Sequence, residues 1–369
     1  MSYNQAPQTP TAPESVPNFV VHKYLEKVPP VDIQAAVRDI LSKAGVPHVF
    51  TRLDYELVLG THGEEEDADV LDPFFPADIF FPEQPGDQRE YDVFQSIADG
   101  FRTMKHVAFE EIFPGAFTFA VFQKLGGSGA GIGNVDSAPE SEEYTTLATA
   151  IREGKKFIDD RAKSTTALPE VAKQYWNVHK RVAAAQLVRE KTMITRIAPE
   201  IARLIQRKPK LQKAHRIQIV QSLGLSHILF SRAIAGVHIR QHLPPKIHFK
   251  FDDELMRKAA YHEVGAYTEE EIDPYLLATR AIIERCVKDL INPLIAFDAR
   301  DAGDEIKWFI HYVAGQASQE DLEKIYAMRS LPYSRRANEF AAFLKERKLP
   351  SSTKEIVLFF KVSHHKPTD

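Results

Sequence analysis

The stretch PEVAKQYWNVHKRVAAAQLVREKTMITRI, Pro169–Ile197, decides the fold class. Its apolar residues recur at helical spacing on one face: Val171, Tyr175, Val178, Val182 and Leu187. This pattern predicts a long amphipathic helix. Pro199 follows shortly afterwards and predicts a break, after which a fresh helical segment runs to Arg207.

Helical spacing continues toward the C-terminus. We predict helices over residues 211–223, 226–241, 252–263, 274–291, 304–314, 318–328 and 334–348. The clearest begins at Pro274, because Asp273 before it is a good N-cap and proline fits the first helical position. Lys354–Val362, KEIVLFFKV, fits either a strand or a packed tail.

The N-terminal third has a different character. A helix is predicted around residues 33–41, and the alternating pattern of His48–Gly60, HVFTRLDYELVLG, predicts a strand. An acidic loop broken by prolines follows, and a helix is predicted over residues 91–107. Leu125–Asn134, LGGSGAGIGN, fails the dinucleotide and P-loop templates and therefore predicts a flexible linker. A further helix is predicted over residues 141–163.

The predicted fold is mainly α: a helical body with a small mixed α/β N-terminal lobe and an extended N-terminal arm. Five regions are expected. They are a flexible Pro-rich arm (1–28), an acidic N-terminal lobe (29–125), a Gly-rich linker (126–140), a basic helical region (141–250) and a C-terminal helical region (251–369).

Composition excludes several classes of protein. The chain has 369 residues, of which 44% are hydrophobic and 27% charged, as in ordinary globular proteins. A single cysteine, Cys286, rules out an internal disulfide, and it lies on an apolar helical stripe, which indicates a core position. The N-terminus does not resemble a secretory signal, and no apolar run is long enough to predict a transmembrane helix.

The charges are strongly segregated along the chain. Residues 171–250 contain sixteen Lys or Arg against two Asp or Glu, whereas residues 61–100 contain twelve acidic residues against one cation. Such an excess of positive charge requires a compensating anion. The anion could be nucleic acid, an anionic membrane, or the acidic segment of this chain or of a neighbouring subunit.

Nucleic acid is the predicted partner of these cations. The predicted nucleic-acid-binding residues are Lys180, Arg181, Arg203, Arg207, Lys208, Lys210, Lys213, Arg216, Arg232, Arg240, Lys246 and Lys250. Tyr175 and Trp176 are candidates for base stacking, with core packing as the alternative for Trp176. Six phosphate contacts to single-stranded RNA would give a log–log salt slope of roughly −4.

Other kinds of site find less support. His238 and His242 are spaced like zinc ligands, but neighbouring cations and the absence of an HExxH motif argue against a metal, so no metal or cofactor is predicted. Ile219–Gly236, IVQSLGLSHILFSRAIAG, is similar to a DNA-binding helix-turn-helix, which is the first alternative function. No catalytic motif occurs, so a non-enzymatic protein is predicted. A helical enzyme or scaffold without a recognisable motif is the second alternative.

In its layout the chain resembles the nucleoproteins and coat proteins of RNA viruses. The resemblance rests on a helical body, a cationic region and a terminal arm, not on a specific motif. It implies a structural protein that self-assembles through the arm and encapsidates RNA, more often single-stranded. We expect no membrane partner, and location in the cytoplasm, or in the virion if the chain is viral.

Overall fold

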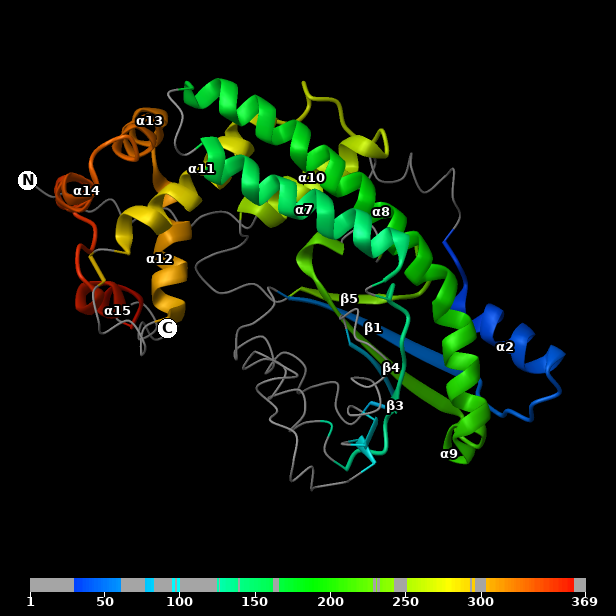
Figure 1. Cartoon of the computed structure of the whole chain (residues 1–369). Coiled ribbons are helices and arrows are strands. Elements are labelled where there is room, and N and C mark those ends of the chain that lie inside the picture. The colour runs from blue at the N-terminus through cyan, green and yellow to red at the C-terminus, as the bar shows by residue number, and fades with distance from the viewer. Residues whose placement is uncertain are drawn as a thin grey trace, which may run out of the picture.

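The computed structural model describes residues 30–60, 77–82, 95–99, 125–161, 166–241, 251–295 and 303–361, apart from residues 97, 126, 139, 228–229, 231–232 and 293. Helices predominate there, and one small parallel sheet accompanies them (Figure 1). The chain is therefore mainly α with a small α/β part, as predicted. The predicted arm, residues 1–28, lies outside the described residues. No described helix is both long and apolar enough to cross a membrane.

Five parallel strands form the sheet in the order β3-β2-β4-β1-β5. Their bounds are β1 Arg52–Gly60, β2 Ile79–Phe81, β3 Gly131–Ile132, β4 Arg216–Gly224 and β5 His238–Gln241. The adjacent strands β1 and β4 pair along their whole length, from Arg52 opposite Arg216 to Gly60 opposite Gly224. Alternate residues of both strands are apolar and buried in one core, which confirms the predicted strand in His48–Gly60.

Helix α8, Leu168–Arg207, joins two hydrophobic cores. Its 40 residues extend over roughly 60 Å at the rise of an α-helix. Met193, Ile197 and Ile201 in its C-terminal half share a core with the sheet and with α2, Ile33–Lys43. Its N-terminal half belongs to a second core, which contains the C-terminal helices (Figure 1). The predicted helical stretch is thus the element on which both parts assemble.

The predicted break at Pro199 does not occur, because α8 continues through it to Arg207. A proline inside a helix leaves the carbonyl group four residues earlier without its helical donor. Pro199 and Thr195 are both exposed, so water can hydrate that carbonyl group. The cost of the proline is therefore reduced at this position.

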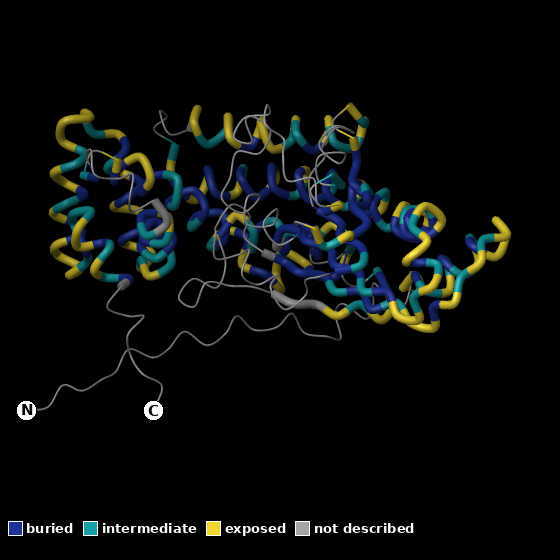
Figure 2. Tube along the Cα trace, turned by 90° about the horizontal axis from the view of Figure 1, so that it is seen from below, coloured by how far each residue is buried: buried dark blue, intermediate teal, exposed yellow. Residues whose placement is uncertain are grey.

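The helical body surrounds the N-terminal half of α8. Helix α7, Glu142–Arg161, approaches α8 closely at Gly154, where a Cβ atom would lie 3.2 Å from Val178 Cγ1. The remaining helices are α9 Pro209–Gln212, α10 Phe251–Glu263, α11 Pro274–Ile291, α12 Gly303–Gln316, α13 Gln319–Met328, α14 Tyr333–Glu346 and α15 Thr353–Lys361. Figure 2 shows their exposed residues on outer sides and their buried residues where the elements face one another.

The structure tests two predictions for the helical body, the start of α11 and the type of element formed by residues 354–362. Helix α11 begins at Pro274, and Asp273 Oδ1 accepts a hydrogen bond from the Leu276 backbone N–H at 2.9 Å, which confirms the predicted N-cap. The sequence of Lys354–Val362 fits either a strand or a packed tail. Most of it lies in helix α15, whose buried Ile356 and Phe360 are four residues apart on one face.

The predicted helices over residues 211–241 are wrong. Arg216–Gly224 is strand β4, a short 3₁₀ turn covers Leu225–His227, and His238–Gln241 is strand β5. Ile217, Ile219 and Leu223 lie at even spacing and are buried in the same core, because β4 pairs with β1 and β2. The helix-turn-helix alternative is therefore excluded, and the basic region 141–250 is only partly helical.

The Gly-rich stretch is not a linker. Gly131–Ile132 forms β3, which pairs with β2 at the edge of the sheet. A Cβ atom at Gly133 would collide with the ring of Phe81, so glycine is required there for close packing. The sheet also unites strands from the predicted acidic lobe, β1 and β2, with strands from the predicted basic region, β4 and β5.

Candidate functional site

Most of the predicted nucleic-acid-binding cations that the structure describes are already paired within the chain. Eight of the twelve have described side chains, and six of these eight form ion pairs. The pairs are Lys180–Glu269 (2.8 Å), Arg181–Glu153 (3.4 Å), Arg203–Glu200 (2.5 Å), Lys208–Asp99 (3.4 Å), Lys210–Asp78 (3.7 Å) and Arg216–Asp54. The expectation of unpaired cations therefore fails for these six residues.

The acidic segment 61–100 contributes directly to this pairing. Asp78 and Asp99, its described acidic residues, meet Lys210 and Lys208 of the same chain. Lys208 also donates to the backbone oxygen of Ala130 at 2.8 Å. The alternative of an acidic partner within the chain is thus confirmed for these two lysines.

The remaining predicted cations fall into two groups. Arg207 and Lys213 are exposed and have no carboxylate partner among the described residues. The side chains of Arg232, Arg240, Lys246 and Lys250 lie outside the described part of the chain, as does His242. The cations also lie in two places. Lys180 pairs with a residue that follows α10, and Arg181 pairs with a residue of α7. The cations from residue 207 to 216 lie elsewhere, where α8 ends and β4 begins.

The predicted stacking residues do not face solvent. Tyr175 is 4% exposed and Trp176 is 1% exposed, and both belong to the core of the helical body. Trp176 Nε1 donates to Glu269 Oε1 at 3.0 Å. Because an open ring face is needed to stack on a base, the stacking prediction is wrong, and the core alternative for Trp176 is confirmed.

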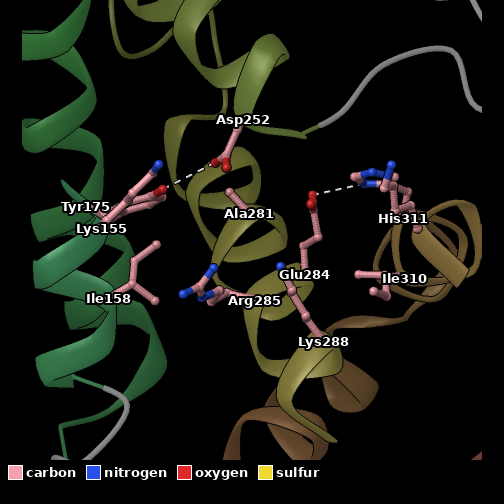
Figure 3. A pocket seen from close by; sticks show the side chains of 11 residues that line it. Lys155, Ile158, Tyr175, Asp252, Ala281, Glu284, Arg285, Lys288, Ile310 and His311 are labelled. Carbon is pink, nitrogen blue, oxygen red and sulfur yellow. Dashed lines mark hydrogen bonds and ion pairs between the residues drawn. The ribbon is translucent and has the colours of Figure 1, made fainter. Parts of the chain in front are cut away.

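A cavity of about 280 Å³ lies among α7, α8, α10, α11 and α12, and we call it the helical pocket (Figure 3). Its polar and charged lining residues are Lys155, Tyr175, Asp252, Glu284, Arg285, Lys288, Lys307 and His311; Ile158, Ala281 and Ile310 supply apolar surface. Helix α11 forms its centre, and α7 and α12 lie on opposite sides of it (Figure 3). Basic side chains outnumber acidic ones in this lining by four to two.

Two polar pairs lie in this lining. Tyr175 Oη donates to Asp252 Oδ1 at 3.2 Å, and His311 Nδ1 lies 3.1 Å from Glu284 Oε2 (Figure 3). The second pair is close enough for an ion pair, but neither atom makes an aligned hydrogen bond within the described residues. Both atoms are buried, so the pair holds α11 and α12 together at the edge of the pocket.

The environment of Asp252 raises its pKa toward neutral pH. Burial, and then the nearby carboxylates of Glu284 and Asp253, raise the pKa of Asp252 to about 7. Its side chain is 54% exposed within the open pocket, so water opposes part of this shift. A carboxyl group with a pKa near 7 suits proton transfer at physiological pH.

His179 cannot supply a positive charge beside Asp252 at neutral pH. Its Nε2 atom lies 3.8 Å from Asp252 Oδ1, but burial lowers the pKa of His179 to about 3. Burial also raises the pKa of Tyr175 well above its usual value, so its hydroxyl stays protonated. Asp252 therefore faces a neutral imidazole and a hydroxyl donor on the α8 side.

Two other kinds of site, a cysteine nucleophile and a metal site, find no support among the described residues. Cys286 is buried as predicted, and burial raises the pKa of its thiol to about 12, so the thiolate needed for nucleophilic chemistry is not formed. Among the described residues, no group of three or more His, Cys, Asp or Glu is arranged to hold a metal ion.

Comparison with known proteins gives no match. No protein family model matches the chain, and neither a curated protein nor a solved structure is significantly similar to it. The helical pocket therefore has to be interpreted from its own geometry.

No local pattern in the sequence indicates the helical pocket. Asp252 is one of three acidic residues in the first turn of α10, where the helix dipole alone explains it. Glu284 and His311 lie in predicted helices but form no local motif, and His311 is 27 positions beyond its partner in the numbering. Only the packing of five helices brings these residues together.

Proposed function

We propose that the helical pocket binds a small anionic ligand and that this is the main function of the described part of the chain. The single observation that supports this best is the convergence of Lys155, Arg285, Lys288 and Lys307 on one cavity. They come from three helices, so the charge concentration is a property of the tertiary structure. Asp252 and Glu284 line the same cavity, and Arg285 also lies 3.3 Å from Asp159 of α7, so the lining keeps only a small excess of positive charge.

The size of the pocket restricts the ligand class. Small-molecule sites have volumes of about 300–1,000 Å³, and the helical pocket is close to the lower limit at about 280 Å³. A compact molecule bearing a carboxylate or phosphate group fits this volume, whereas a protein segment or a nucleic-acid strand does not. This proposal corresponds to the enzyme or scaffold alternative without a recognisable motif.

Anion-dependent stabilisation tests the proposal. Sulfate, phosphate and citrate should raise the melting temperature more than chloride does at matched ionic strength. Lys288→Gln should remove most of this difference, because Lys288 lines the pocket. Lys324→Gln is the matched control, since Lys324 pairs with Glu320 on α13. Equal loss in both variants would show only a general salt effect.

A second candidate function is the binding of single-stranded RNA. It is supported by a basic corner, defined as Arg52, Arg207, Lys208, Lys210, Lys213 and Arg216, where α8, α9 and the first residues of β1 and β4 lie. Asp54, Asp78 and Asp99 pair with four of these cations and leave an excess of three positive charges. The excess favours a polyanion, though less than the sequence predicts.

The salt dependence of RNA binding tests this second candidate. Three uncompensated cations predict a log–log slope of about −2 on a single strand, rather than the −4 expected from six free cations. A slope near zero with retained binding would contradict it. Encapsidation, assembly through the arm at residues 1–28, and location in the cytoplasm and virion all depend on this candidate and remain proposals.

A further inference from the structure

The Asp252 carboxyl group is placed to respond to a ligand in the helical pocket. It lines the cavity and lies in the first turn of α10, with its side chain partly open to the cavity. A carboxylate here would lie beside any bound anion, and the two negative charges would repel each other. A neutral carboxyl group would instead donate its O–H to an anionic oxygen.

Every helix around Asp252 places at least one titratable or charged group near the pocket. The groups are Lys155 from α7, Tyr175 and His179 from α8, Asp253 from α10, Glu284, Arg285 and Lys288 from α11, and Lys307 and His311 from α12. Glu284 and Asp253 favour the protonated form of Asp252, whereas the hydrogen bond from Tyr175 and the nearby His311 favour the carboxylate. The opposing effects leave the protonation of Asp252 sensitive to one added charge.

We propose that the helical pocket binds its anion together with one proton, which Asp252 takes up from solvent. The inference rests on the proposed function of the pocket. The Asp252 carboxylate gains a proton, no other bond changes, and the resulting O–H is donated to an oxygen of the anion. The ligand is therefore an oxyanion, either a carboxylate or a phosphate ester, since such groups accept this hydrogen bond.

The protonation state of the unliganded group supports this proton uptake. Because burial and the carboxylates of Glu284 and Asp253 raise the pKa of Asp252, protonation near neutral pH requires less free energy than for an exposed carboxyl group. The helix dipole at the start of α10 and the water in the open pocket both favour the carboxylate before the ligand arrives. A bound anion displaces that water and adds negative charge, so both changes raise the pKa of Asp252 further.

The affinity for sulfate as a function of pH tests the proposal on the full chain. Sulfate remains ionised throughout the interval from about pH 5.5 to about 8.5, so any pH dependence belongs to the protein. We expect the dissociation constant of the unaltered chain to rise roughly tenfold per pH unit above the pKa of Asp252. Calorimetry in buffers of different ionisation enthalpy should show uptake of one proton.

Three variants identify the group that takes up the proton. Asp252→Asn should bind sulfate with little pH dependence, because the amide is neutral at every pH. Asp253→Asn should retain the pH dependence but begin it at lower pH, because its carboxylate raises the pKa of Asp252. His311→Gln should also retain it. Circular dichroism confirms that each variant is folded.

The outcomes separate this inference from the proposed function. Sulfate binding by the unaltered chain with no pH dependence would overturn the proton uptake and leave the anion pocket intact. Unchanged pH dependence in Asp252→Asn, or its loss in His311→Gln, would also overturn the assignment to Asp252. Absence of sulfate binding at every pH, in the unaltered chain and in Asp252→Asn, would overturn the proposed function itself.

Discussion

Arg189 of α8 and Asp136, which follows β3, form a buried ion pair. Arg189 Nε donates to Asp136 Oδ1 at 2.8 Å, and the two side chains are 8% and 1% exposed. The backbone oxygen of Asp136 also accepts a hydrogen bond from Arg196 Nη1 at 2.6 Å. These contacts attach the segment after the edge strand to the long helix that spans both cores.

Removing one member of this pair should destabilise the protein strongly. Arg189→Met leaves the Asp136 carboxylate buried without its guanidinium partner, and such losses amount to about 3–5 kcal/mol of unfolding free energy. Urea unfolding measures the change. Lys43→Met is the control, because Lys43 and Asp39 are 76% and 58% exposed, and should change stability by less than about 1 kcal/mol. Similar effects of both variants would contradict the importance of burial.

Gly133→Ala should destabilise the edge of the sheet. The added Cβ atom collides with the ring of Phe81, and overpacking of this kind costs about 1–3 kcal/mol. Gly131→Ala is the matched control in the same stretch, since its Cβ atom would meet Leu204 Cδ2 at 3.4 Å. Thermal unfolding should give a clearly lower melting temperature for Gly133→Ala than for Gly131→Ala; equal values would argue against the close approach.

His179 should make the protein sensitive to acid. Its pKa is about 3 in the folded state and near 6.5 when unfolded, so between these values the unfolded chain binds the extra proton. The contribution of His179 to stability is therefore present above about pH 6.5 and is lost as pH falls toward 3. On going from neutral to acidic pH, the unfolding free energy of His179→Gln should fall less than that of the unaltered chain. Urea unfolding across that pH range measures both.

The control for this prediction is the exposed His215 at the start of β4. His215→Gln should leave the shape of the stability–pH curve unchanged. If His179→Gln also leaves it unchanged, burial of a neutral imidazole is not the cause of acid sensitivity.

Asp99 should limit nucleic-acid binding by the basic corner. It pairs with Lys208 at 3.4 Å, so Asp99→Asn removes one compensating negative charge and should strengthen RNA binding while making the salt slope steeper by about 0.7. Asp39→Asn is the control, because Asp39 pairs with Lys43 on α2, outside the corner. Filter binding across a salt series measures both quantities. Equal slopes in the two variants would contradict a role for Lys208.

Local patterns predicted the helices well and the strands poorly. Helix α11 agrees with its prediction because capping by Asp273 and spacing of 3.6 residues are local properties. Strand β4 was predicted as a helix because its apolar run also fits helical spacing over a short distance. Its partner β1 lies more than 150 residues earlier in the numbering, and that pairing is not visible in either segment alone.

The segregation of charge is evident from the sequence, but the pairing of individual charges is not. The cationic stretch and the acidic segment are both evident from composition. Composition does not specify which residues meet, so the pairing of Lys210 with Asp78 and of Lys208 with Asp99 could not be predicted. For the same reason the convergence of Lys155, Lys288 and Lys307 on one cavity was missed.

The sequence by itself determined the helical class, the bounds of several helices and the separation of the two signs of charge, because each depends on neighbours within a few turns of the chain. Only the tertiary structure decided that residues 216–224 join a parallel sheet, that six of the eight described cations predicted to bind nucleic acid have internal partners, and that Asp252 and His311 line one pocket. These features arise from contacts between residues far apart in the chain, whose pairing is selected by the packing of the whole fold.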